Sequence, residues 1–124
     1  TPSTPSIPHL FGLREVLNII NKEGINNRWN RHKEMRDYTI DWAKKHGQSL
    51  FSEEGYHSYT ITCIENIQNW DINKIYNKLL DRGYRMDRGY GNLRGKAFRI
   101  PHMGNIYMED LKDFIHEFEK VLYV

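Results

Sequence analysis

The spacing of apolar residues changes twice along this 124-residue sequence. Residues 10–20 and 111–122 carry apolar side chains three and four positions apart, the spacing that places them on one face of an α-helix. Between these segments the runs "QSLFS" and "SYTITCI" are short and rich in Thr, Ile, Tyr and Phe, which is typical of β-strands. A chain that combines amphipathic helices with short strands can bury both only in a mixed fold.

The order of these elements predicts the fold class. A second helix is expected from about Asn26 to His46, and a third follows Asp71 as N-cap and ends near Gly83. Further strands are expected at "YRMD" and around Phe98. The resulting order, α-α-β-β-α-β-β-α, predicts an α+β two-layer sandwich with a small, mostly antiparallel sheet and helices on one of its faces.

The charge balance gives no general attraction to nucleic acid, because 18 Lys+Arg against 16 Asp+Glu leave a net charge of only +2. The single cysteine, Cys63, excludes an internal disulfide and a multi-cysteine metal site, so we expect a reducing, cytoplasmic compartment and no metal. No run approaches the roughly 18 apolar residues of a membrane-spanning helix. We therefore expect neither a nucleic-acid nor a membrane partner.

The first eight residues, "TPSTPSIP", contain prolines at positions 2, 5 and 8. Each proline disfavours helical geometry in the residue before it, so this stretch is expected to be extended, with the first helix after it ending near Gly24. We expect residues 1–8 to be a linker from a larger domain and residues 9–124 to form one domain. Because the sequence also lacks an initiator methionine, we expect it to be a fragment of a longer protein.

The segment "GKAFRIPHMG" places one arginine in the middle of a predicted strand. Side chains alternate between the two faces of a strand, so Phe98 and Ile100 share one face and Arg99 lies on the other. If the helices cover the face of Phe98, Arg99 points away from them. It then faces either water or another domain.

Three interpretations of Arg99 and the glycine-rich segment before it are open. An exposed or ion-paired surface arginine is the most ordinary one. The basic and aromatic side chains that alternate from Arg82 to Arg99 fit single-stranded RNA, but residues 92–95 lack the aromatic strand of the RNA-recognition signature. The third interpretation is recognition of a small carboxylate, because a planar guanidinium matches a carboxylate with two parallel hydrogen bonds.

Together with the opening residues, this segment resembles the carboxyl-terminal part of class V aminotransferases, the pyridoxal-phosphate enzymes of the alanine–glyoxylate and serine–pyruvate group. The shared motifs are Thr-Pro-x-Thr-Pro-x-Ile-Pro, Leu-Arg-Glu, Glu-Gly-x-x-x-Arg-Trp-x-x-His and Gly-x-Gly-x-x-x-Gly-Lys-x-x-Arg-Ile. They occur in the family's order across the whole chain. Two features depart from the family: Pro101 replaces a glycine and restricts the backbone beside Arg99, and Tyr90, Asn92 and Leu93 decorate the glycine-rich loop differently.

The resemblance implies that Arg99 grips the α-carboxylate of an amino-acid substrate, in a cleft between this small domain and a larger one. It implies that Thr4, and after it Thr1, lie near the cofactor phosphate of the neighbouring subunit in a homodimer. Trp29 and His32 match the Arg-Trp-x-x-His motif, for which we expect an aromatic ring and a hydrogen-bonded histidine, both packed between elements.

The resemblance further implies an aminotransferase that uses pyridoxal phosphate. It would move an amino group between an amino acid of the alanine, serine or aspartate type and a 2-oxo acid such as glyoxylate or pyruvate. The lysine that carries the cofactor belongs to the large domain in this family, so we expect no catalytic residue in this chain and no activity from it alone. His102 is expected to shape the loop after Arg99. The competing interpretation is a stand-alone amino-acid-binding module without catalysis.

Overall fold

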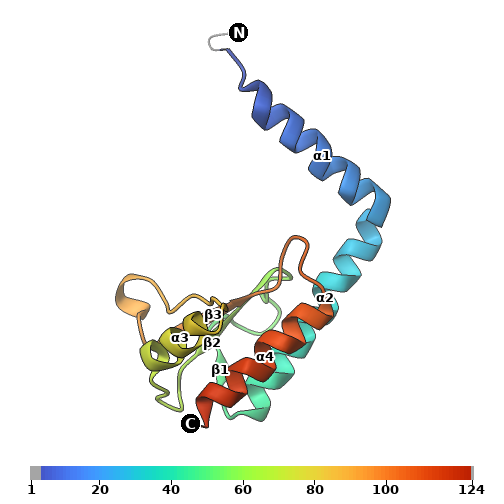
Figure 1. Cartoon of the computed structure of the whole chain (residues 1–124). Coiled ribbons are helices and arrows are strands. Elements are labelled where there is room, and N and C mark those ends of the chain that lie inside the picture. The colour runs from blue at the N-terminus through green and yellow to red at the C-terminus, as the bar shows by residue number, and fades with distance from the viewer. Residues whose placement is uncertain (1–3, 124) are drawn as a thin grey trace. The chain divides into compact units, whose positions relative to one another are not determined.

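The computed structural model describes residues 4–123. In chain order the elements are α1 (Ile7–Glu23), α2 (Ile25–Lys45), β1 (Ser49–Leu50), β2 (Ile61–Glu65), α3 (Ile72–Asp81), a short 3-10 helix (Gly91–Leu93), β3 (Ala97–Pro101) and α4 (Met108–Leu122) (Figure 1). The chain divides into two compact units, of which the first ends at Asn30 and the second begins at Arg31.

The first unit contains α1 and the beginning of α2. α1 begins at Ile7, earlier than predicted, because a proline in the first turn removes no helical hydrogen bond and its fixed φ suits the helix. The predicted end is confirmed, since Gly24 adopts a φ of 82° and its N–H donates to the carbonyl of Ile20. Within residues 4–123, no helix is both long and apolar enough to cross a membrane.

The second unit is built on a three-stranded antiparallel sheet with the order β1-β2-β3. Ile64 of β2 and Phe98 of β3 are partners in the register, and both belong to one core with Ile100. α2, α3 and α4 supply the other side of that core. Helices therefore cover one face of the small sheet, and the predicted α+β fold is confirmed (Figure 1).

Aromatic rings form the centre of this core. Phe98 packs against Trp70 and Phe118, with ring centroids 6.1 Å and 5.8 Å away, and Trp42 meets Phe118 edge-on at 5.0 Å. Phe98 and Phe118 have no exposed surface. β3 is thus anchored on one face by large buried rings.

One predicted strand is not formed. At residues 84–87 the structure has only a single bridge, in which Asp87 and Arg99 exchange two backbone hydrogen bonds. The chain then turns through Gly89, Gly91 and Gly95, all of which have a positive φ. Pairing with β3 therefore ends after one residue, because the loop leaves the edge of the sheet at that point.

Candidate functional site

Arg99 lies in the middle of β3, on the face of the sheet that the helices leave uncovered. Its neighbours Phe98 and Ile100 are fully buried on the opposite face. The side chain of Arg99 itself is 40% exposed. The orientation predicted from the alternation of the strand is therefore confirmed.

Asp87 holds the guanidinium of Arg99 from one side. Arg99 Nε donates to Asp87 Oδ1 at 2.9 Å, and Nη2 lies 2.8 Å from Oδ2. The hydrogen bond from Arg99 holds the pKa of Asp87 below its ordinary value, and the same bond raises the pKa of Arg99. Both groups therefore remain charged at neutral pH.

This pairing leaves one edge of the guanidinium open. A guanidinium carries five N–H donors, and Asp87 takes one from Nε and one from Nη2. Within residues 4–123, Nη1 has no hydrogen-bond partner. Two parallel donors on Nη1 and Nη2 are the geometry that binds a carboxylate through two hydrogen bonds.

The glycine-rich loop brings Asp87 to this position. Gly89 adopts a φ of 83°, and its N–H donates to Asp87 Oδ1 at 2.8 Å. A Cβ at Gly89 would lie 2.4 Å from the carbonyl oxygen of Leu93 and 2.6 Å from that of Ala97, so conformation and space both require glycine. The glycines are visible in the sequence as turn residues, but the role of Asp87 is not, because an aspartate before a turn carries no signal of its distant partner.

Cys63 lies opposite Arg99 in the register of β2 and β3. Burial raises the pKa of its thiol; Arg99 acts against this shift and Asp87 adds to it. The net effect is a raised pKa, so the thiol is neutral and is a weak nucleophile near pH 7. Cys63 is therefore uncharged beside the ion pair and does not compete with a bound anion for Arg99.

The residues after Arg99 fix the end of the strand. His102 has no exposed surface, and its Nε2 lies 2.9 Å from Thr62 Oγ1. Burial lowers the pKa of His102 to about 4, so its ring is neutral at pH 7. Pro101 still pairs with Ile61, because β3 is an edge strand, where a missing N–H is tolerated.

The structure does not group the remaining predicted residues with Arg99. Thr4 is exposed and lies in the first unit, whereas Arg99 lies in the second, and Thr1 is outside the described residues. Trp29 is 56% exposed, so the prediction of a packed aromatic ring is wrong for the part of the chain that the structure describes. His32 is 7% exposed and is buried as predicted.

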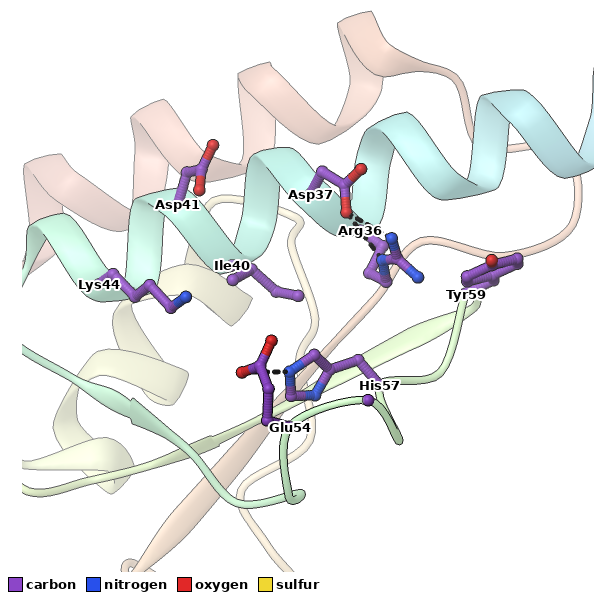
Figure 2. A pocket seen from close by; sticks show the side chains of 9 residues that line it. Arg36, Asp37, Ile40, Asp41, Lys44, Glu54, His57 and Tyr59 are labelled. Carbon is purple, nitrogen blue, oxygen red and sulfur yellow. Dashed lines mark hydrogen bonds and ion pairs between the residues drawn. The ribbon is translucent and has the colours of Figure 1, made fainter.

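A cleft of about 520 Å³, which the sequence did not predict, lies between α2 and the loop before β2 (Figure 2). Arg36 on its wall donates from Nε and Nη2 to Asp37 Oδ1, and its guanidinium lies 4.4 Å from the ring centroid of Tyr59. Its cation is thus already paired and stacked. The other charged or titratable lining residues are Asp41, Lys44, Glu54 and His57.

No protein-family model matches the chain. Among curated proteins, an uncharacterized aminotransferase of Methanocaldococcus jannaschii is 33% identical over 106 residues, which are 84% of this chain and 27% of that protein. The serine–glyoxylate aminotransferase of Arabidopsis thaliana is 33% identical over 108 residues, which are 85% of this chain and 27% of that protein.

Among solved structures, the alanine–glyoxylate aminotransferase of Nostoc sp. superposes with a TM-score of 0.84 at 31% identity. The match covers 97% of this chain and 32% of that one. The chain therefore spans between 27% and 32% of the length of these relatives.

Proposed function

Because this chain belongs to the class V aminotransferases of the alanine–glyoxylate and serine–glyoxylate group, and corresponds to their carboxyl-terminal part, we propose that the polypeptide containing it is an aminotransferase. The reaction moves an amino group from an amino acid of the alanine, serine or aspartate type to a 2-oxo acid such as glyoxylate or pyruvate. The names of the relatives, which join serine or alanine to glyoxylate, support this substrate class.

In this proposal Arg99 binds the α-carboxylate of the amino donor and of the oxo acid. One observation supports this role. The Nη1 and Nη2 edge of the guanidinium is open on the uncovered face of the sheet, while Asp87 binds the Nε and Nη2 edge. Both substrates share a carboxylate next to the reacting carbon. A fixed two-point grip on that group orients the reacting carbon without touching it.

The cofactor of the proposed enzyme is pyridoxal phosphate, which, when bound, supplies the electron sink for moving the amino group. Thr4 could donate a hydrogen bond to the phosphate of the cofactor, since it is exposed and carries a hydroxyl group. Thr1 has the same role in the proposal. No lysine of residues 4–123 is buried: all are exposed except Lys78, which is half-buried. A lysine that binds the cofactor covalently is usually desolvated, so we assign that lysine to another part of the polypeptide and expect this chain alone to be inactive.

We further propose that the enzyme is a homodimer in the cytoplasm, in which Thr4 of one subunit reaches the cofactor phosphate of its neighbour. The support is the motif "TPSTPSIP" together with the single cysteine. Size-exclusion chromatography with light scattering measures the oligomeric state. A monomer that is fully active would contradict this part of the proposal.

The test uses the complete polypeptide that contains this chain, purified with pyridoxal phosphate. Alanine, serine or aspartate should bleach the visible absorbance of the bound cofactor, and a 2-oxo acid should restore it. Arg99→Ala should raise KM for the donor by roughly 10- to 100-fold and also lower kcat, because a charged hydrogen-bonding partner is lost.

A matched control is Arg82→Ala. Arg82 is 41% exposed and is also paired with a carboxylate, that of Glu117, but it is the C-cap of α3 and its partner lies in α4. Its loss should leave the kinetics unchanged. A polypeptide that binds no cofactor, or Arg99→Ala with wild-type kinetics toward every donor, would overturn the proposed function.

A further inference from the structure

Asp87 and Arg99 form a two-pronged ion pair in which each carboxylate oxygen accepts from its own nitrogen. Other arginine–carboxylate pairs in the second unit are simpler. Arg36 directs both donors to a single oxygen of Asp37, and its partner is the adjacent residue. Two parallel hydrogen bonds fix the plane of a guanidinium, whereas contact with a single oxygen leaves it free to swing.

The carboxylate of Asp87 is itself fixed. Its backbone is bridged to Arg99 by hydrogen bonds of 2.9 Å and 3.1 Å, and Oδ1 accepts the N–H of Gly89 at 2.8 Å. Gly89 in turn packs against the backbone of Leu93 and Ala97 too closely for any side chain. The anchor of the guanidinium is therefore tied to the strand and to the turn, and not only to a mobile side chain.

From this arrangement we propose that Asp87 is a positioning residue: it fixes the guanidinium of Arg99 so that only the Nη1 and Nη2 edge meets the substrate carboxylate. This inference rests on the proposed function of Arg99. The carboxylate must then approach end-on and in the plane of the guanidinium. Asp87 itself touches no substrate.

The negative charge of Asp87 does not increase the affinity for the substrate carboxylate. A negative group at 2.8 Å neutralises much of the field of Arg99, so it cannot strengthen the attraction of an anionic substrate. What it provides is orientation, and a misplacement of about 1 Å at a reacting centre can cost on the order of 100-fold in rate. Removing Asp87 should therefore lower kcat while KM stays the same or falls. Loss of folded protein would also lower the apparent kcat without changing KM, so kcat is expressed per enzyme that carries bound cofactor.

The decisive variant is Asp87→Asn in the complete polypeptide. Asparagine keeps an oxygen for the Gly89 N–H, so the turn is retained, but it loses the second acceptor for the guanidinium. We expect kcat to fall by about 10-fold with KM unchanged or lower, and Asp87→Ala to show the same split with a larger loss of kcat. Nitrogen-15 NMR of the Arg99 Nε–H should show faster exchange with water in both variants.

The control is Glu117→Gln, which removes a carboxylate of α4 that also pairs with an arginine, Arg82, and not with Arg99. It should leave kcat and KM at wild-type values. The inference is overturned if Asp87→Asn stays within about two-fold of wild type in kcat, gains activity, or loses kcat with a raised KM.

Arg99→Lys separates the two proposals, because lysine keeps the charge and loses the planar fork. If Arg99→Ala, Arg99→Lys and Asp87→Asn are all silent, the proposed function of Arg99 fails and the inference fails with it. If Arg99→Lys is impaired and Asp87→Asn is silent, the inference alone fails.

Discussion

Neighbouring residues of β3 lie in contrasting environments, one buried and the other partly exposed. Phe98 and Ile100 have no exposed surface and contact three helices through a shared core, whereas Arg99 between them is 40% exposed and contacts a loop. Phe98 is held by the size and shape of its ring. Arg99 is held by hydrogen bonds to Asp87.

The difference shows how one strand separates stability from recognition. Burial of large apolar side chains supplies most of the free energy of folding, and it does so on one face only. The other face is free to carry a charge, because an ion pair there loses little solvation and contributes little stability. The two faces should therefore respond to mutation in opposite ways.

The largest expected effect is on the covered face. Phe98→Ala should lower the free energy of unfolding by about 3–5 kcal/mol, because it leaves a cavity between Trp70 and Phe118. Urea unfolding followed by tryptophan fluorescence measures the change. Phe51→Ala removes the same ring from a position that is 50% exposed and should cost less than about 1 kcal/mol. Equal losses from the two variants would contradict the contrast between the faces.

The covered face also carries a titratable group. His102 lies two positions after Ile100, as Ile100 does after Phe98, and all three side chains are buried on the same face. Burial lowers the pKa of His102 from 6.5 to about 4, so between these values the unfolded chain binds more protons than the folded one. The free energy of unfolding should therefore fall by about 3 kcal/mol as the pH drops from 6.5 to 4.

Urea unfolding at a series of pH values measures this slope. His102→Gln should flatten it, although the variant is less stable at neutral pH. His116→Gln, in which an exposed histidine of α4 is changed, should leave the slope as it is. A wild-type slope in His102→Gln would show that another group is responsible.

A third prediction concerns the stability of the glycine-rich turn that places Asp87 on the uncovered face. Gly89 and Gly91 both have a positive φ, but a Cβ would clash with backbone oxygens at Gly89 and meets nothing within 4 Å at Gly91. Alanine at Gly91 should cost about 1 kcal/mol from conformation alone, and alanine at Gly89 roughly twice that or more. Thermal unfolding of the two variants compares them. Equal costs would mean that the loop relaxes around the new side chain.

The smallest effect on stability is expected on the uncovered face. Arg99→Gln should change the free energy of unfolding by at most about 1 kcal/mol, because the pair with Asp87 is half-exposed. Urea unfolding tests this directly. A loss as large as that of Phe98→Ala would show that Arg99 holds the fold together and would remove the separation between the two faces.

Local patterns were sufficient for the elements that depend on near neighbours. Asp71 was predicted as an N-cap, and its side chain accepts the N–H of Lys74. Gly24 was predicted to end α1, and the face of Arg99 followed from the period of its strand. Each of these features is decided within a few residues, where the geometry of the backbone limits the choices.

Long-range partners were not predictable. Asp87 lies in an irregular loop, so no period connects it to Arg99, and the strand expected at residues 84–87 is a single bridge. The cleft of Figure 2 combines α2 with the loop around Glu54 and His57, which only the folded chain brings together. Trp29 shows the opposite case: its motif position predicts a packed ring, and the ring is 56% exposed.

Patterns in the sequence were enough to predict that helices and short strands share one α+β sandwich, that Arg99 faces away from the core, and which family the motifs resemble. They could do so because side-chain period and capping are local properties of the backbone. The tertiary structure decided which carboxylate holds Arg99 and which edge of the guanidinium stays open. Those facts depend on where a loop returns to the edge of the sheet, and that path is set by glycine conformations and close backbone packing at Gly89.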